Sequence, residues 1–486
     1  MSRISRDRRD LGDRRDLRDR YVDFLRAWAI VLVVFGHWLI TGLVRGPGGE
    51  ISAPELLATV PWTQWLTLLF QIMPLFFLAG GHAAGGSWSR AAGGTAEWVG
   101  RRALRLLLPA GVYSGLVLGA VAVCSAVGVD PGTLALVGWA MAMQFWFLPV
   151  YLLLSALTPV LYAAHRRWGL LVPVVMGLVA LAADILVLSA HLPYVGLLNY
   201  VLVWGVAYQL GFCWRDGLIT GSGTRKDRKG RKDRQDRKDR KDRQDRKDRK
   251  DRQDRKQWVP VAMVAGGGGA FAALVGLGPF PVSLILVTGQ EPSNTDPPSA
   301  AMLAWTVAQV GLALLLAPAL RRLLERERVW RAVRPLGGVS MTLYLWHMLP
   351  VLVVAAAFYL TGLAPQPRYG SAGWWALRVP WLVVLGVVLV GVVVALRPLE
   401  RGLGVLYERG GTGRPWALWL GLAAGVAALT RFAAQGFAHE GRFPVLPALG
   451  LAVGVALVML PGRAPERRLK EPEDADGSKD SLEEAA

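Results

Sequence analysis

Long apolar blocks separated by short polar segments run along most of this chain. The first block covers residues 24–44, and the others cover residues 61–84, 104–127, 138–163, 169–190, 193–214, 258–288, 299–320, 338–361, 374–397, 415–434 and 443–461. An α-helix needs roughly 20 mainly apolar residues to cross a bilayer. The pattern therefore predicts an all-α, polytopic integral membrane helix bundle with about 10–12 transmembrane helices.

Basic residues are concentrated in every second loop between these blocks. If the N-terminus is cytoplasmic, the inside loops contain Arg101 and Arg102, Arg166 and Arg167, the segment 215–256, and the arginines of 321–334 and 397–414. The intervening loops hold only scattered charges. Cytoplasmic loops of membrane proteins carry an excess of Lys and Arg. We therefore expect a multi-pass protein of the cell membrane with both termini in the cytoplasm.

The blocks and the polar segments divide the chain into six parts. Residues 1–20 are expected to be a disordered basic cytoplasmic tail, 21–214 transmembrane helices 1–6, and 215–257 a low-complexity charged cytoplasmic linker. Residues 258–397 would supply helices 7–10, 398–464 an extra transmembrane pair, and 465–486 a disordered acidic tail. The linker repeats Lys-Asp-Arg or Gln-Asp-Arg, so its aspartates cancel much of the attraction that its basic residues would have for anionic lipid. We favour a spacer over a lipid-binding element.

The net charge of +19 would be consistent with nucleic-acid binding in a soluble protein. Here the basic residues lie at the ends of apolar blocks and in the repeat, which argues against a nucleic-acid surface. Both cysteines, Cys124 and Cys213, fall inside predicted spans, so no disulfide framework is expected. We also expect no metal site.

The first apolar block carries two ionisable residues, Arg26 and His37, eleven positions apart. At about 100° per residue, eleven positions return to the same helix face within roughly 20°. The two side chains would lie about 16 Å apart along the axis, the arginine near the surface and the histidine deep. An intramembrane ionisable residue is by default a candidate functional residue. The alternative is a snorkelling arginine and a histidine bonded to a neighbouring helix.

Arg102 and Arg105 open the third block three residues apart, on one helix face and on the predicted cytoplasmic side. With Arg26 they could form a cationic cup, and guanidinium groups suit the geometry of phosphate. They could equally be ordinary positive-inside anchors.

Three further features place polar or aromatic chemistry inside the apolar blocks. The fourth contains Gln-Phe-Trp-Phe-Leu-Pro, residues 144–149, and the ninth contains Tyr344 and His347. Asp184, in the fifth, is the only carboxylate deep within a block. It could orient a histidine, line a wet cavity or pair with another helix. The histidines at block ends, His165, His191 and His439, are expected to be interfacial.

Five of these elements, in this order, resemble the acyltransferase family 3 of integral membrane proteins. They are Tyr-x-Asp-x-Leu-Arg with ten residues and then His37, Pro-Leu-Phe-Phe-Leu-Ala-Gly-Gly at 74–81, Arg102-x-x-Arg105, Trp-Phe-Leu-Pro at 146–149, and Tyr-Leu-Trp-His at 344–347. The resemblance covers about residues 20–397. His82, the basic insert and the last two blocks depart from the family pattern.

The resemblance implies transfer of an acyl group, commonly acetyl from acetyl-CoA or another acyl-CoA, to a hydroxyl or amine. Acceptors would be glycans, lipid-linked sugars or secreted metabolites. Arg26, Arg102 and Arg105 would hold the CoA phosphates, and His37 would act as general base or carry the acyl group. We add Asp184 as a candidate partner for His37 or His347. Trp146, Tyr344 and His347 are assigned to substrate binding.

Two other functions fit parts of the pattern. A twelve-span secondary transporter matches the helix count, but the two halves contain no matching pair of interrupted segments. A membrane scaffold would use the charged repeat to recruit partners, but it would not need an intramembrane histidine and carboxylate. The resemblance therefore favours an O-acetyltransferase over a transporter or a scaffold.

Overall fold

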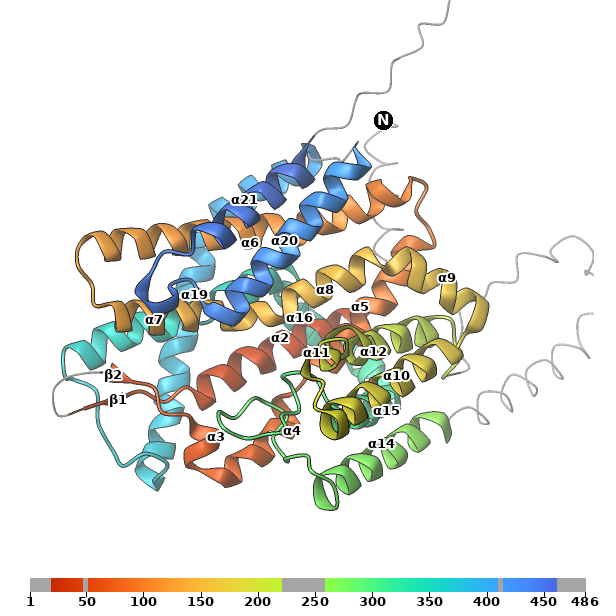
Figure 1. Cartoon of the computed structure of the whole chain (residues 1–486), viewed down its shortest axis with the longest axis horizontal. Helices are drawn as coiled ribbons and strands as arrows, with labels where there is room; N and C mark the ends of the chain where they lie inside the picture. Colours follow the sequence, from red (N-terminus) through yellow and green to blue (C-terminus); the bar gives the residue numbers. More distant parts are fainter. Residues whose placement is uncertain (1–18, 47–50, 221–257, 410–413, 461–486) are drawn as a thin grey trace, which may run out of the picture.

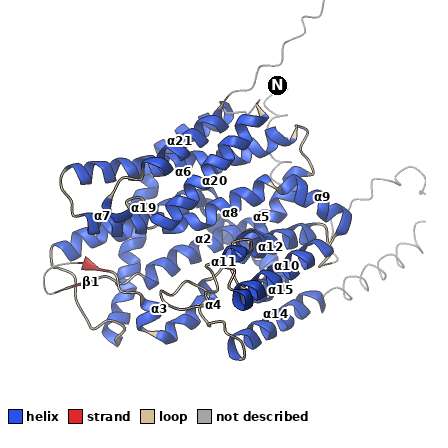
Figure 2. Ribbon diagram, viewed as in Figure 1, coloured by secondary structure: helices blue, strands red, loops and turns tan. Residues whose placement is uncertain are grey.

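The computed structural model describes residues 19–46, 51–220, 258–409 and 414–460. These residues form a bundle of helices with one small two-stranded hairpin (Figures 1 and 2). Most of the expected 1–20 tail, most of the 215–257 linker and the 465–486 tail lie outside the described residues.

Ten helical segments of the described chain are long and apolar enough to cross a membrane, and a bent pair gives an eleventh. They are α2 (Arg20–Ile40), η1, α4 and α5 (Pro61–Leu66, Thr67–Phe70, Met73–Trp88), α6 (Thr95–Ala126), α7, η2 and α8 (Pro131–Ala142, Met143–Trp146, Phe147–Ala156), α10 (Leu171–Ala190), α11 and α12 (Pro193–Gly196, Asn199–Arg215), α14 (Trp258–Gly276), α15 (Ala300–Glu325), α17, α18 and η3 (Ser340–Trp346, Leu349–Val354, Ala355–Leu360), α19 (Ala372–Arg409) and α20 (Pro415–Gln435). The shorter apolar helix α21 (Val445–Met459) follows α20. The structure thus confirms the all-α polytopic bundle.

The remaining elements lie at the two ends of the bundle. They are the hairpin β1–β2 (Val44–Arg45, Ile51–Ser52), α3 (Leu56–Thr59), α9 (Thr158–Trp168), α16 (Glu327–Gly338) and η4 (His439–Gly441). We call the end with α9, α16 and the N-terminus of α2 the basic face, because its loops carry the arginine clusters. The end with the hairpin, α3 and η4 is called the opposite face. Figure 1 shows the hairpin and α9 at opposite sides of the molecule.

Helix α2 is the central element of the bundle and contacts α5, α15, α16, α17 and α19. It begins where the Asp19 side chain accepts a hydrogen bond from the Tyr21 N–H, which satisfies one of the unpaired donors of the first turn. The Tyr21 hydroxyl donates to the Ala313 carbonyl of α15 at 2.6 Å. Both contacts fix α2 at the basic face.

Glycines allow two neighbouring helices, α5 and α12, to approach closely. A Cβ atom on Gly81 would lie only 1.9 Å from the Tyr208 carbonyl oxygen, and one on Gly211 would lie 2.2 Å from the Leu78 carbonyl oxygen. Small residues at helix contacts are typical of membrane bundles, where close van der Waals packing replaces hydrophobic association.

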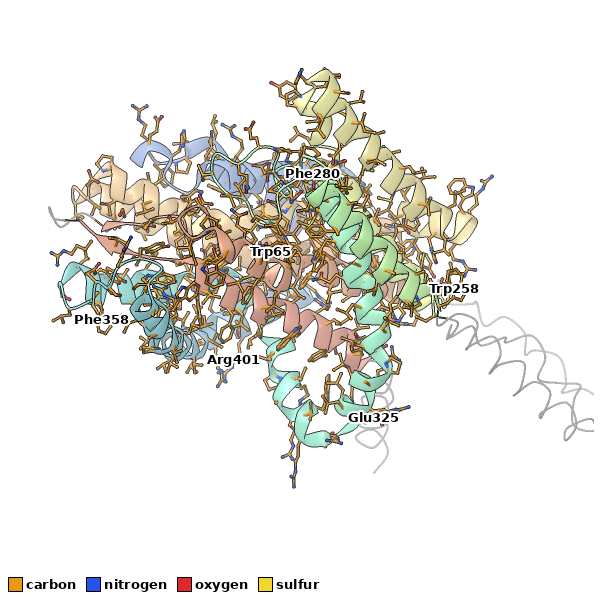
Figure 3. The ribbon with its side chains drawn as sticks, turned by 90° about the horizontal axis from the view of Figure 1, so that it is seen from below. Trp65, Trp258, Phe280, Glu325, Phe358 and Arg401 are labelled. Carbon is orange, nitrogen blue, oxygen red and sulfur yellow. The ribbon has the colours of Figure 1, made fainter. Side chains whose placement is uncertain are left out.

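The predicted block 258–288 is not helical over its whole length. Helix α14 ends at Gly276, before Pro279 and Pro281, which cannot continue a helix. In Figure 3, Trp258 and Phe280 lie near opposite ends of α14, and Glu325 marks the end of α15. The segment after α14 folds back against the bundle, where the Gln71 amide donates to the Leu284 carbonyl at 2.8 Å.

The last two helices pack on one side of the bundle, away from α14 (Figure 1). Helix α21 contacts α6, and α20 contacts α6, α7, η2 and α8. Residues 415–459 are therefore integrated into the bundle.

Candidate active site

A cavity of about 1440 Å³ runs from the opposite face into the interior of the bundle. Its wall near the opposite face includes Glu55, Thr133 and Asp296, and its inner wall includes His37 and Tyr344. Ligand pockets typically have a volume of about 300–1,000 Å³, so this cavity can hold a molecule larger than a typical small ligand.

One face of α2 forms a wall of this cavity. Ile30, Val33 and His37 line it. Arg26 precedes Ile30 by four residues and therefore lies on the same face of α2. His37 is in the last turn of α2, three residues before Ile40, so it lies nearer to the opposite face than the expected deep position. The side chain is only partly exposed, and it lines the cavity.

The His37 imidazole pairs with a second imidazole, that of His347. The His37 Nδ1 and His347 Nε2 atoms are 2.7 Å apart, and the ring centroids are 5.0 Å apart with nearly parallel planes. His347 is fully buried and does not line the cavity. The structure therefore places His347 behind His37, rather than in the expected position against the substrate.

The hydrogen bonds of the pair determine which nitrogen carries each proton. The His347 Nδ1 atom lies 2.9 Å from the Tyr344 carbonyl oxygen, which can only accept, so Nδ1 carries the proton. In the neutral imidazole the His347 Nε2 atom is then an acceptor, and His37 Nδ1 donates to it. This leaves the Nε2 lone pair of a neutral His37 free to accept a proton.

A break in the ninth span places His347 in this position. Helices α17 and α18 are bent by 43° relative to each other, and His347 lies between them. The Trp38 indole N–H donates to the His347 carbonyl at 2.7 Å, which ties the break to α2. Pro350 lies in the first turn of α18, where its missing N–H leaves no intrahelical hydrogen bond unmade.

Gln144 is a residue of this site for which the sequence motifs predict no role. Its side chain is 1 % exposed, lines the cavity, and donates to the Met141 and Leu345 carbonyls at 2.9 and 3.2 Å. These two acceptors fix the orientation of the amide, and the Oε1 atom has no partner among the described residues. The Tyr344 hydroxyl donates to the Gln144 carbonyl at 2.8 Å. A polar residue within an apolar block was the signal that could have identified it.

Trp146 and Tyr344 both line the cavity, as expected for substrate-binding residues. The Trp146 ring packs against Trp204 with centroids 5.6 Å apart, and Tyr344 packs edge-on against Phe147. The aromatic residues of the fourth span thus form part of the inner wall.

Arg26 lies on the basic side of this wall, one helical turn beyond Ile30. Its guanidinium lies 5.7 Å from the centroid of the Phe76 ring, which packs against Phe147 and Tyr151. The Arg26 Nε atom is buried and finds no hydrogen-bond partner within the described part of the chain. A buried guanidinium N–H without a partner is suited to an anionic ligand such as a phosphate.

Arg102 and Arg105 also lie at the basic end of the bundle, but they face different neighbours. Arg102 lies over the Trp98 ring at 4.9 Å and interacts electrostatically with Tyr208. Arg105 is exposed and lies close enough to Tyr407 of α19 to interact with its phenol. All three arginines thus lie at the basic end of the bundle, beside different neighbours.

Asp184 is not brought to either histidine, which corrects the role expected for it. Its carboxylate accepts a hydrogen bond from the Asn199 amide at 2.8 Å and another from the Ala300 backbone N–H. Ala300 is the first residue of α15, so Asp184 satisfies an unpaired backbone donor of this helix. A negative charge at this position also interacts favourably with the positive N-terminal end of the helix dipole. The partner of His37 is His347.

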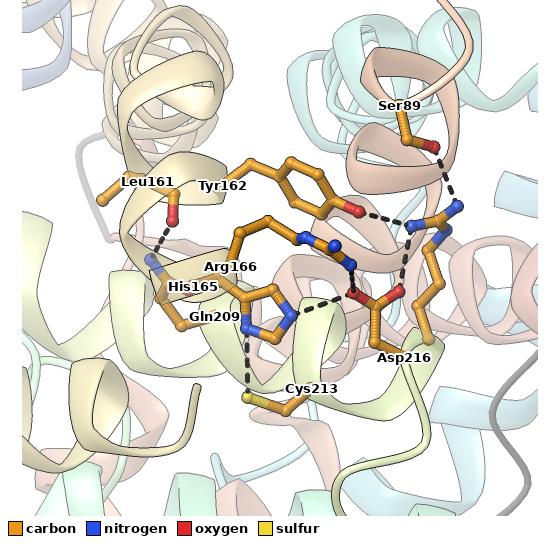
Figure 4. Close-up of polar contacts among 9 residues, drawn as sticks. Ser89, Leu161, Tyr162, His165, Arg166, Gln209, Cys213 and Asp216 are labelled. Atoms are coloured by element: carbon orange, nitrogen blue, oxygen red, sulfur yellow. Dashed lines mark hydrogen bonds and ion pairs between the residues drawn. The ribbon is translucent and has the colours of Figure 1, made fainter. Parts of the chain in front are cut away.

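A second histidine cluster lies at the basic face (Figure 4). His165 is 3 % exposed rather than interfacial, and its Nε2 atom lies 3.2 Å from Asp216 Oδ2. Arg215 donates to the same carboxylate at 3.1 Å and to Tyr162 and Ser89, while Arg166 lies 4.0 Å away. Burial raises the pKa of Asp216, but the His165 hydrogen bond and the two arginines outweigh it and hold the pKa below its ordinary value.

Cys213 completes a Cys-His-Asp sequence of contacts in this cluster. Its Sγ atom lies 3.7 Å from His165 Nδ1. The cysteine is 0 % exposed, so no substrate reaches the thiol in this structure. The cluster joins α5, α9 and α12 at the basic face, and we interpret it as a structural clamp. His82 also belongs to this end, with its ring 4.5 Å from that of Trp214.

The fold and the cavity define a polytopic membrane protein with a paired imidazole inside the bundle. A family model described as an acyltransferase domain matches residues 19–397, so the chain belongs to this family, the acyltransferase family 3. It is thus a membrane acyltransferase, and family membership does not support the transporter alternative. Comparison with curated proteins gave no match, and comparison with solved structures gave none either.

Proposed function

We propose that this protein transfers an acyl group, in the first instance acetyl, from a cytoplasmic acyl-CoA to a hydroxyl or amine. The acceptor would be a glycan, a lipid-linked sugar or a secreted metabolite, and the protein would act in the cell membrane. The observation that carries the proposal is the His37–His347 pair, with the unprotonated His37 Nε2 in a side chain that lines a large cavity.

In this mechanism His37 is the general base. Its Nε2 atom takes the proton of the acceptor hydroxyl while the acceptor oxygen adds to the thioester carbonyl carbon. When the tetrahedral adduct collapses, the carbon–sulfur bond breaks and the sulfur takes the proton from His37. His347 holds the His37 ring in the required tautomer, and its own Nδ1–H is held by the Tyr344 carbonyl.

The basic half of α2 would bind the donor. Arg26 has an unpaired buried N–H and lies about 16 Å from His37 along the helix axis. A phosphate bound there, with Arg102 and Arg105 nearer the basic face, would direct the thioester arm along α2. Phe76 and Phe147 lie between Arg26 and the cavity, so this path would require them to move.

The test is acyl transfer by membranes that contain the protein, with radiolabelled acetyl-CoA as donor and an extract of the producing cells as acceptor. His37→Ala is expected to abolish incorporation at saturating donor. The control is His191→Asn, because His191 is an exposed histidine with a left-handed backbone conformation that Asn tolerates. Full incorporation by His37→Ala, at equal expression, would refute the proposed base.

A further inference from the structure

The last two helices lie beyond residue 397, where the family match ends. Helix α20 nevertheless supplies part of the cavity wall, with the small or medium side chains of Val426, Thr430, Ala433 and Ala434. Its large side chains Leu429 and Phe432 are buried in the bundle core instead. The helix therefore presents only small or medium side chains to the cavity, which leaves room for a ligand.

The turn after α20 anchors this wall to the site. Gly436 has φ of +75°, which glycine adopts without strain, and the Phe437 N–H donates to the Gly138 carbonyl of α7 at 3.1 Å. The buried Phe437 ring packs edge-on against Phe145 and Tyr113. Tyr113 lies 3.1 Å from the Gln144 amide, so the turn is connected to the polar network of the cavity.

The charged side chains that line the cavity have one sign. Glu55, Asp130 and Asp296 line it near the opposite face, and none of its described lining residues is Lys or Arg. Each carboxylate is hydrogen-bonded by neutral donors: the Thr288 N–H, the Thr133 N–H and hydroxyl, and the Tyr200 hydroxyl, respectively. These contacts leave the negative charges in place, and carboxylates at the mouth of a cleft repel anions and attract cations.

Gln144 indicates the hydrogen-bonding character of the ligand. It is 1 % exposed and lines the inner cavity, and its Oε1 atom lacks a donor in the described structure. A buried acceptor without a partner is costly, and a ligand hydroxyl or amine would satisfy it.

We propose that this cavity is the acceptor site, that it takes an uncharged or cationic hydroxyl- or amine-bearing molecule, and that α20 is one of its walls. The inference rests on the proposed function and specifies the acceptor. Anionic acceptors are disfavoured by the three carboxylates. Helix α20 lies outside the matched region, so a helix beyond the family domain would help to determine how large an acceptor the cavity admits.

The first test compares two adjacent positions of α20 at the same depth. Val426 lines the cavity, whereas Ala427 is exposed and does not line it. Both lie roughly 13 Å from the end of α20 at Gln435. Val426→Cys and Ala427→Cys are made in a Cys124→Ala, Cys213→Ala background. Each full-length protein is treated in membrane vesicles with a cationic or an anionic methanethiosulfonate.

We expect both reagents to modify Val426→Cys, and the cationic one about tenfold faster after correction for its reactivity with a free thiol. Ala427→Cys should resist both reagents, because its thiol would face lipid. Equal reactivity at the two positions would overturn α20 as a cavity wall. An anionic reagent as fast as the cationic one would overturn the charge preference. Labelling needs no catalysis, so failure of acyl transfer would leave this result intact.

The second test measures acceptor size. Val426→Phe should reduce transfer from radiolabelled acetyl-CoA to an extract of the producing cells by at least about tenfold, while Ala427→Phe should retain it. Thermal unfolding in detergent checks that both variants are folded. Equal transfer by the two folded variants would refute a role of α20 in acceptor binding.

Discussion

The molecule contains two buried histidine clusters that differ in the partner of the imidazole. His165 at the basic face is paired with the carboxylate of Asp216, which is also bound by arginine, and the thiol beside it is fully buried. His37 is paired with another imidazole, and it lines a large cavity. The Asp216 carboxylate can only accept hydrogen bonds, whereas the His347 ring both donates and accepts them. We therefore interpret the first cluster as a clamp and propose that the second moves protons.

The largest expected effect comes from replacing each of these histidines with alanine in turn. His37→Ala should lower transfer at saturating donor by at least about a thousandfold, since general base catalysis contributes about 10²–10⁴-fold. His165→Ala should reduce the unfolding temperature but keep transfer within a few-fold in the folded fraction. The measurement is initial rate per folded protein. A similar loss of rate in both variants would remove the distinction between the clusters.

The next effect concerns His347, which we propose acts through its hydrogen bond to His37. His347→Ala should lower the rate by about 10–100-fold, because the His37 tautomer is no longer fixed. His347→Gln should recover part of the rate, since its amide oxygen can accept the His37 Nδ1–H. Rates measured across pH should show a shifted profile for His347→Ala. A purely structural role would give equal losses for Ala and Gln and an unchanged profile.

Arg26 should affect donor binding more than turnover. Arg26→Ala removes a guanidinium that could form charge-assisted hydrogen bonds to a donor phosphate, so the KM for acetyl-CoA should rise about tenfold with a smaller change in kcat. Arg26→Lys should recover part of the affinity. Unchanged KM values in Arg26→Ala would refute the phosphate assignment.

Asp216→Asn tests the clamp through stability and pH. At neutral pH the free energy of unfolding of the variant should be about 1–3 kcal/mol lower, because a partly buried hydrogen-bond acceptor loses its charge. A carboxyl with a lowered folded-state pKa stabilises the protein above its ordinary pKa of about 4, and the contribution is lost as the pH falls through the folded-state value. Unfolding curves of the two proteins should therefore converge only below about pH 4. A constant difference down to pH 3 would contradict the ion pairing.

The smallest effect is expected for the charged repeat. Deletion of residues 225–256 should leave transfer nearly unchanged, because the aspartates cancel much of the basic charge of the repeat. Transfer assays on the deleted and full-length proteins provide the measurement. A large loss would show that the repeat takes part in activity or assembly.

Most of the fold and one side of the site could be predicted from local sequence. Apolar blocks gave the helices, because a span of lipid-facing residues must satisfy its backbone internally. The helical period placed Arg26 and His37 on one face of α2, and Ile30 and Val33 between them line the cavity. These features depend on residues close together in the chain.

Contacts between distant segments could not be predicted in the same way. Asp184 looked like a partner for a histidine because it is a carboxylate in an apolar block, but its partners are Asn199 and the start of α15. The His37–His347 pairing joins residues 310 positions apart and depends on the bend beside His347. The end of α14 at Gly276 followed from prolines that the hydropathy of the block concealed.

Because Arg26 and His37 belong to the same unbroken helix, the spacing between them is as rigid as α2 itself. A hydrogen-bonded helix does not stretch, so the distance between the proposed phosphate anchor and the proposed base is fixed. A donor would then be chosen by the length of chain between its phosphates and its reactive carbonyl. Truncated thioesters that bear the same acyl group would fall short.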